Sequence, residues 1–152
     1  MEKSLADAFG LSEVVVVPGD SDEDSGVLQE LGRAGADILL HYLKPQNVIA
    51  VGGGSTLAQV AKGVHKNISG IVVVPARVGL GETVEVQANT VASVLAHGLS
   101  GQYRMLHMPD GLKEKAINLV LEANPDMQEI LELIQKADIL IQGIGRSEDM
   151  AN

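Results

Sequence analysis

The chain has 152 residues, 45% of them hydrophobic and 20% charged, and it carries a formal net charge of −9. One hydrophobic core is expected at this length, and the apolar content excludes a chain that is mainly disordered. No apolar run approaches the ~18 residues of a membrane span, and the absence of cysteine excludes disulfides and thiolate-bound metal. A cysteine-free chain of this kind fits the cytoplasm, and we expect that localisation.

Short aliphatic runs alternate with helical patterns along the chain. Runs that are apolar throughout are typical of parallel strands covered on both faces. The predicted strands are Val14–Val17, Val48–Val51, Ile71–Val74, a weaker Tyr103–Met108, and Ile139–Ile141. Apolar residues at helical spacing begin near Val27, Leu57, Val84 and Ile130. This alternation predicts an α/β fold in one unit, residues 1–152, with a doubly wound, mostly parallel Rossmann-like sheet.

The last residues predict a fold that continues further. The turn Gln142–Gly145 follows the final strand, and Ser147–Asp149 has the composition of a helix start, yet the sequence ends at Asn152. We therefore expect a fragment, a domain that is incomplete at its C-terminus.

The first of three glycine turns after predicted strands is Gly52–Thr56. It opens a helix, where backbone N–H groups and the positive end of the helix dipole favour an anion. It is not a Walker A loop, and Leu57 stands where a dinucleotide fingerprint needs a third small residue. The turn predicts a phosphate site at Gly53, Gly54, Ser55 and Thr56, and the alternative is a tight turn with Ser/Thr capping.

The second turn adds a cation at the end of the strand Ile71–Val74. Arg77 lies there beside Gly79, and a guanidinium can bind phosphate with two parallel hydrogen bonds. Gln87, in a helix predicted over Thr83–His97, can add an amide contact. The alternative is a surface ion pair between Arg77 and a nearby glutamate, which would stabilise little.

The third turn is Gln142–Gly145. Ligands of open α/β sheets bind outside the carboxyl ends of the strands, where the strand order reverses. Because all three turns follow strands, we expect them to converge on one crevice.

The remaining polar residues predict neither a metal site nor a cofactor. The acidic run Asp20–Asp24 fails the calcium-loop register, because Gly26 comes one position late and Leu31 replaces the required Glu. It suits a helix N-terminus better, although Asp20 or Asp22 could accept sugar hydroxyls. The four histidines lack ligand spacing. Glu82 would be the candidate base of an isomerase, and one carboxylate does not establish catalysis.

Several of these motifs together resemble the effector-binding domain of bacterial SorC-family transcriptional regulators. The segments are Val17–Asp22, Gly52–Thr56, Val74–Glu82, Gln87–Ala92, Tyr103–Leu106 and Gly143–Gly145. The resemblance implies a fold like that of ribose-phosphate isomerases and glucosamine-phosphate deaminases without their catalysis. It also implies a homo-oligomer and a phosphorylated sugar as ligand, with fructose-1,6-bisphosphate the leading candidate. Ser55 and Thr56 would hold one phosphate, and Arg77 and Gln87 would add contacts.

The chain also departs from that family. Its members begin with a helix-turn-helix region that has no counterpart before Leu11, and further phosphate-binding residues of the family lie beyond Asn152. Val78 replaces the family's usual Gly. The net charge of −9 opposes DNA binding by the segment itself, so operator DNA would be contacted elsewhere. A sugar-phosphate sensor without catalysis is the main hypothesis. The alternatives are an isomerase or deaminase of the same architecture, or an oligomerisation piece whose turns are only turns.

Overall fold

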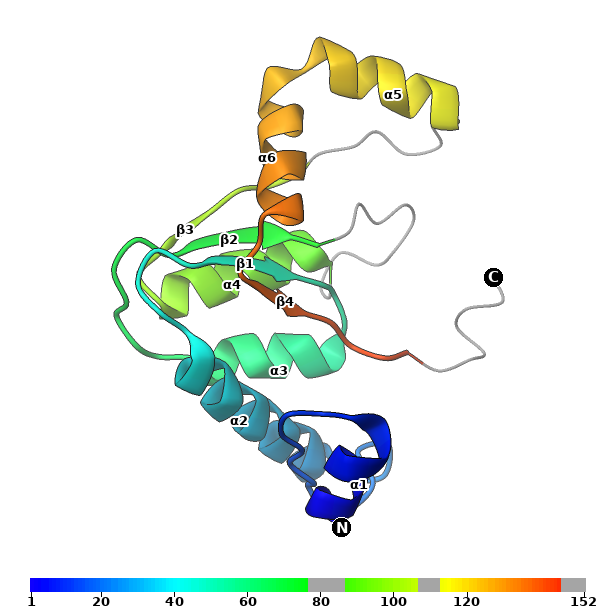
Figure 1. Cartoon of the computed structure of the whole chain (residues 1–152), viewed down its shortest axis with the longest axis vertical. Coiled ribbons are helices and arrows are strands. Elements are labelled where there is room, and N and C mark those ends of the chain that lie inside the picture. Colours follow the sequence, from blue (N-terminus) through cyan, green and yellow to red (C-terminus); the bar gives the residue numbers. More distant parts are fainter. Residues whose placement is uncertain (77–86, 107–112, 146–152) are drawn as a thin grey trace.

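The computed structural model describes residues 1–76, 87–106 and 113–145 (Figure 1). In chain order its elements are α1 (Glu2–Phe9), α2 (Ser25–Tyr42), β1 (Val48–Val51), α3 (Ser55–Gly63), β2 (Val72–Pro75), α4 (Ala88–Gly98), β3 (Gln102–Tyr103), α5 (Glu114–Ala123), α6 (Pro125–Gln135) and β4 (Ile139–Ile141). None of the helices in these residues is long and apolar enough to cross a membrane.

The described strands form one parallel sheet in the order β3-β2-β1-β4. Ile49 of β1 lies opposite Val73 of β2 on one side and Ile139 of β4 on the other. The chain runs outward from β1 through β2 to β3, and then returns to the far side of β1 to form β4. The strand order therefore reverses between β1 and β4. The prediction of a doubly wound parallel sheet is confirmed.

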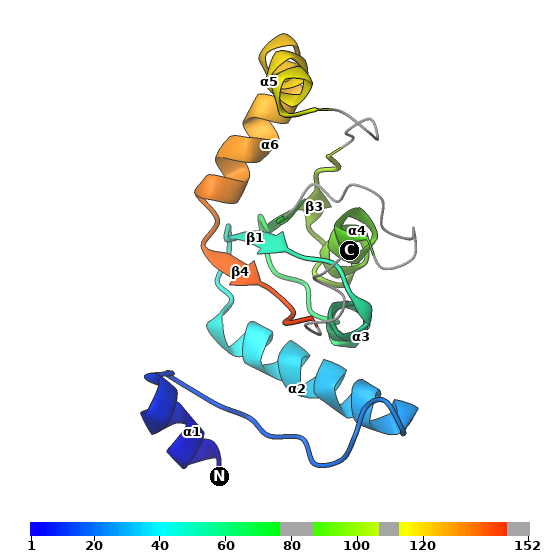
Figure 2. The same ribbon diagram turned by 90° about the vertical axis from the view of Figure 1, so that its right-hand side faces the viewer.

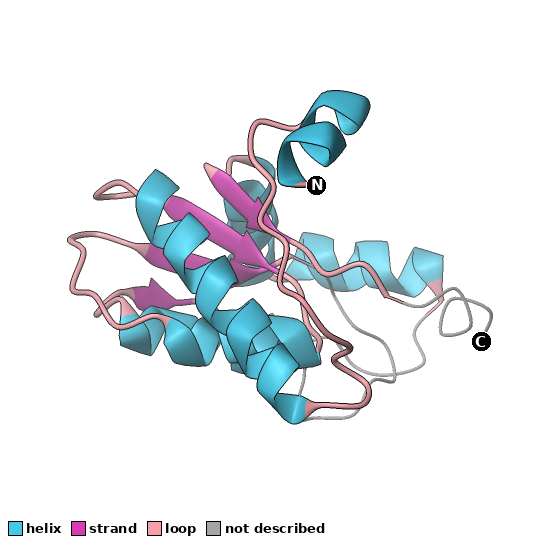
Figure 3. Cartoon of the chain, turned by 90° about the horizontal axis from the view of Figure 1, so that it is seen from below, coloured by secondary structure: helices cyan, strands magenta, loops and turns pink. Residues whose placement is uncertain are grey.

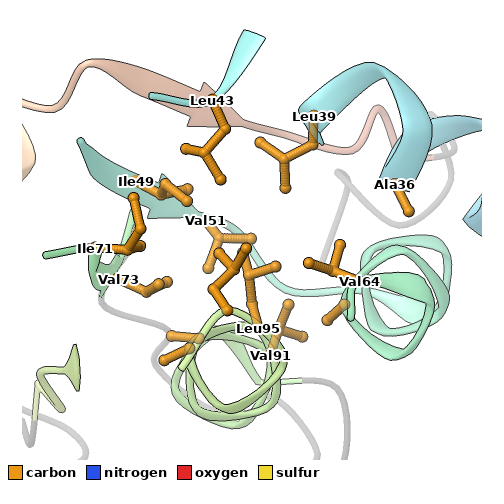
Figure 4. Packing of buried hydrophobic residues seen from close by; sticks show 14 of the residues in the cluster. Ala36, Leu39, Leu43, Ile49, Val51, Val64, Ile71, Val73, Val91 and Leu95 are labelled. Atoms are coloured by element: carbon orange, nitrogen blue, oxygen red, sulfur yellow. The ribbon is translucent and has the colours of Figure 1, made fainter. Parts of the chain in front are cut away.

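The central strands are buried on both faces, which explains why their sequences are apolar throughout. Ile49, Val51 and Val73 pack in the larger core with α3 and α4 (Figure 4). Ala50 and Val74 alternate with them, so they face the opposite side of the sheet, where α6 packs (Figure 2). Figure 3 shows the strands side by side with helices flanking them.

The strand predicted at Val14–Val17 is wrong. These residues form an extended segment outside the sheet, and Val15 is 43% exposed. The N–H of Val16 donates to Oε1 of Glu2 at 2.9 Å instead of to a neighbouring strand. A β-branched run favours extended backbone, but a strand also needs a partner, and here tertiary context overrides propensity.

Other boundaries also differ from the sequence prediction. β3 is two residues long, and the end of the predicted Tyr103–Met108 strand lies outside the described residues. The described part of the predicted Thr83–His97 helix begins at Ala88. The predicted helix start at Ser147–Asp149 lies outside the described residues. Two helices, α1 and α5, were not predicted. The α5–α6 pair extends from the sheet that α6 contacts (Figure 1), and Leu106, which follows β3, forms a small core with Met127 and Ile130 of α6.

Candidate functional site at the carboxyl edge of the sheet

Three strands end at the same edge of the sheet. The N–H of Gly52 donates to the carbonyl of Ile141 at 2.9 Å, and the N–H of Ala76 donates to the carbonyl of Val51 at 2.8 Å. The residues that follow β1, β2 and β4 therefore start side by side. This edge includes the point where the strand order reverses, which is where open α/β sheets bind ligands.

Gly54 turns the chain from β1 into α3. Its φ of +121° and ψ of +159° lie in a region that is accessible almost only to glycine. No side chain of the described residues caps α3, and the side chains of Ser55 and Thr56 are exposed. The Ser/Thr capping proposed as the alternative is thus not formed. The first turn of α3 presents N–H groups, the positive end of the helix dipole and two hydroxyls at one place.

The turn after β4 lies against the turn after β1. A Cβ on Gly52 would stand 2.9 Å from Oε1 of Gln142, so the Gln142 amide packs directly on the Gly52 backbone. A Cβ on Gly143 would stand 3.9 Å from Cγ of Leu57 in α3. The first and third glycine turns therefore lie together at this edge, as predicted. Gln142 was not among the predicted site residues, because an uncharged amide at a strand end has no distinctive sequence pattern.

The N-terminal ends of α3 and α4 are neighbours. Ser55 of α3 and Thr90 of α4 line the same hollow of about 250 Å³, together with Leu28 of α2. Gln87 is the N-cap residue of α4 and is half-buried, and its backbone carbonyl accepts a hydrogen bond from the N–H of Val91 at 3.1 Å. Gln87, which the sequence predicts to add an amide contact, thus lies at the start of α4, next to the start of α3.

Of the predicted site residues, Gly53, Gly54, Ser55, Thr56 and Gln87 are in the described structure. Arg77 and Gly79 lie outside the described residues, as does Glu82. Ala76, the last described residue before them, is at the carboxyl edge.

The acidic run Asp20–Asp24 starts a helix, as the sequence indicated. Oδ1 of Asp24 accepts from the N–H of Gly26 at 2.7 Å and caps α2, and Oδ1 of Asp20 accepts from the N–H of Asp22 at 2.8 Å. In the part of the chain that the structure describes, no group of three or more His, Asp or Glu side chains could hold a metal ion.

A larger hollow of about 730 Å³ lies between α2 and β4. Its lining includes Leu39, Tyr42 and Leu140 and is mainly apolar. It has no helix N-terminus and no glycine turn among its lining residues. The carboxyl edge is therefore the better candidate for an anion, despite the smaller hollow beside it.

Comparisons with known proteins give matches over nearly the whole chain. A family model described as "Putative sugar-binding domain" matches residues 1–152. Two curated proteins named Central glycolytic genes regulator are similar: one from Priestia megaterium is 41% identical over 154 residues, and one from Bacillus subtilis is 37% identical over 153. Each alignment covers 99% of this chain and 45% of the relative, so the chain spans about half the length of these proteins. A crystal structure described as that of a "putative SorC family transcriptional regulator" from Enterococcus faecalis has a TM-score of 0.86 at 38% identity, covering 99% of this chain and 62% of that one.

Proposed function

The chain belongs to the sugar-binding domain family of SorC-family transcriptional regulators, and on this premise we propose that it is the part of a regulator that senses a phosphorylated sugar. The observation that carries the proposal is the exposed first turn of α3, with Ser55 and Thr56, beside Gln142 where the strand order reverses. N–H groups and hydroxyls at such a place suit a phosphate dianion, whose charge strengthens each hydrogen bond.

The ligand that we propose is fructose-1,6-bisphosphate. The relatives at 41% and 37% identity are named as regulators of central glycolytic genes, and a glycolytic sugar phosphate is a fitting signal for such a protein. One phosphate would bind at Gly53, Gly54, Ser55 and Thr56. Arg77, Gly79 and Gln87 would complete the site.

We propose that the domain binds its ligand without transforming it. An isomerase or deaminase needs a positioned acid or base. Of the described edge residues 52–56, 76, 87 and 142–145, none is Asp, Glu, His or Lys. Lys62 lines the adjacent hollow, and Glu82, the candidate base of the isomerase alternative, lies outside the described residues. Turnover assays with sugar phosphates test this directly, since any product formed would favour the enzyme alternative.

We also propose the setting in which the domain acts. Residues 1–152 would form one effector-binding domain of a cytoplasmic homo-oligomeric regulator. Operator DNA would be contacted by other parts of that protein, because a net charge of −9 repels the phosphate backbone.

Thermal denaturation with fructose-1,6-bisphosphate and with unphosphorylated fructose tests the proposal. At a ligand concentration 100 times the Kd, binding adds about 2.7 kcal/mol, which raises Tm by roughly 5–10 °C. Fructose should leave Tm unchanged. Ser55→Ala combined with Thr56→Ala should remove most of the shift, whereas Ser4→Ala, an exposed serine in α1, should keep it. A folded sample whose Tm responds to no sugar phosphate would contradict the proposal.

A further inference from the structure

Asn89, in the first turn of α4, bonds both backbone groups of one distant residue. Its Nδ2 donates to the carbonyl of Leu106 at 3.0 Å, and the N–H of Leu106 donates to its Oδ1 at 3.0 Å. Leu106 is only 5% exposed. This pairing needs a short side chain with a donor and an acceptor in one plane. Asp offers only acceptors, and Gln places its amide one carbon further out.

Leu106, the partner of Asn89 in this pair of hydrogen bonds (the Asn89–Leu106 bridge), is held in place by contacts on its own side. The N–H of Arg104 donates to the carbonyl of Val73 at 3.0 Å, which continues the pairing of β3 with β2. Nη2 of Arg104 also donates to Oε1 of Glu129 in α6 at 3.0 Å, in an exposed ion pair that adds little stability. Leu106 itself packs against α6 in the smaller core. The Asn89–Leu106 bridge therefore connects the start of α4 to both β2 and α6.

The start of α4 is the part of that helix that belongs to the candidate site. Gln87 is two residues before Asn89, and Thr90 follows Asn89 and lines the hollow that Ser55 also lines. A small rotation of α4 about its far end would move Gln87 relative to the first turn of α3. If a ligand is bound by the starts of both α3 and α4, the distance between Gln87 and the first turn of α3 determines how many contacts the ligand can make at once.

We propose that Asn89 is a positioning residue for the ligand, which sets the place of Gln87 by holding the first turn of α4 on Leu106. The inference rests on the proposed function, since it assigns Gln87 to the binding site. Asn89 itself would not touch the ligand, because both ends of its amide are engaged with Leu106.

A double-mutant cycle tests this mechanism. Fructose-1,6-bisphosphate is titrated calorimetrically into the wild type, Gln87→Ala, Asn89→Ala and the double variant. Each single change should weaken binding by about 2- to 10-fold, the range expected for one hydrogen bond. The Kd of the double variant should be no higher than that of the single variant with the higher Kd, because Asn89 acts only through Gln87. If Asn89 had a purely structural role, the fold-increases in Kd of the two single variants would instead multiply in the double variant.

Two further variants control for stability. Asn47→Ala removes a similar bond, from the N–H of Lys44 to Oδ1 of Asn47 at 2.8 Å, at the opposite end of β1, and it should leave the Kd unchanged. Asn89→Gln keeps the donor and the acceptor but displaces them, so it should weaken binding even if Asn89→Ala does not fold.

The outcomes separate this inference from the proposed function. If Gln87→Ala weakens binding while both Asn89 variants bind as the wild type does, the positioning role is refuted and the site stands. Multiplied effects in the double variant refute it as well. If Gln87→Ala binds normally while Ser55→Ala does not, Asn89 has no residue to act through and the inference fails. If the wild type binds no phosphorylated sugar, both the proposed function and the role of Asn89 fail.

Discussion

Replacing Gly54 by alanine isolates the contribution of one backbone conformation to the candidate site. At φ +121° and ψ +159° alanine is strained, whereas its Cβ would meet no heavy atom within 4 Å. The cost is therefore conformational, about 1–3 kcal/mol, with no steric overlap to add. We expect Tm to fall by roughly 2–12 °C, at about 2–4 °C per kcal/mol for a chain of this size.

The same substitution should also damage ligand binding. Relief of the strain would rotate the N–H groups of the first turn of α3 away from a bound phosphate, and one charge-assisted hydrogen bond is worth about 1.5–3 kcal/mol. The Kd measured by calorimetry should rise at least about tenfold.

Gly10→Ala is the matched control for Gly54→Ala. Gly10 also has a positive φ, +64°, and open space around a Cβ, but it ends α1, far along the chain from the site. Gly10→Ala should lower Tm and leave the Kd unchanged. If Gly54→Ala alters neither Tm nor Kd, the turn does not hold the conformation on which the site depends. If both variants weaken binding equally, the loss reflects global stability.

Further predictions concern stability, titration and self-association. Gly32→Ala in α2 would place a Cβ 2.8 Å from the backbone carbon of Gln59 in α3, so urea denaturation should show a loss of about 1–3 kcal/mol. The hydrogen bond from the Tyr42 hydroxyl to Oε2 of Glu13 raises the pKa of Tyr42 above its ordinary 10.0. The folded state thus holds this proton more tightly, and the stabilisation present below pH 10 is lost as the pH rises through the raised pKa. Glu13→Gln should lower the ultraviolet titration midpoint of Tyr42 in a variant whose other tyrosine is phenylalanine. Leu140 is 64% exposed on β4, which is at the edge of the sheet formed by the described strands, and should promote association. Leu140→Lys should therefore reduce the apparent mass in light scattering at high concentration without lowering Tm.

The sequence predicts the central strands well because strands buried on both faces are apolar at every position. β1 and β2 are covered on both faces and read as unbroken aliphatic runs. β3 consists of the exposed residues Gln102 and Tyr103 and has no continuous apolar run. Its bounds could therefore not be predicted from the sequence. Val14–Val17 has the same composition as the true strands but no strand beside it in the described structure. Strand formation depends on a partner that local sequence does not reveal.

The candidate site was predictable to the extent that it follows from chain order. A glycine turn between a parallel strand and a helix must lie at the carboxyl edge, which located Gly52–Thr56 without coordinates. The contact of Gln142 with Gly52 depends on the register that pairs Val51 with Ile141, and sequence does not specify that register. The Asn89–Leu106 bridge joins a side chain to backbone 17 residues away, and nothing in the spacing distinguishes this asparagine from others.

An acidic chain can recognise an anion because the two effects act over different distances. The net charge of −9 is distributed over the whole molecule and is screened within about 8 Å at physiological salt. Backbone N–H groups at the start of α3 act at hydrogen-bond distance, where screening is weak and geometry decides the energy. A small phosphate at this edge would experience mainly those donors, whereas a DNA duplex would approach many acidic side chains at once. If the proposed function holds, a net charge of −9 therefore opposes contact with operator DNA much more than binding of a small sugar phosphate.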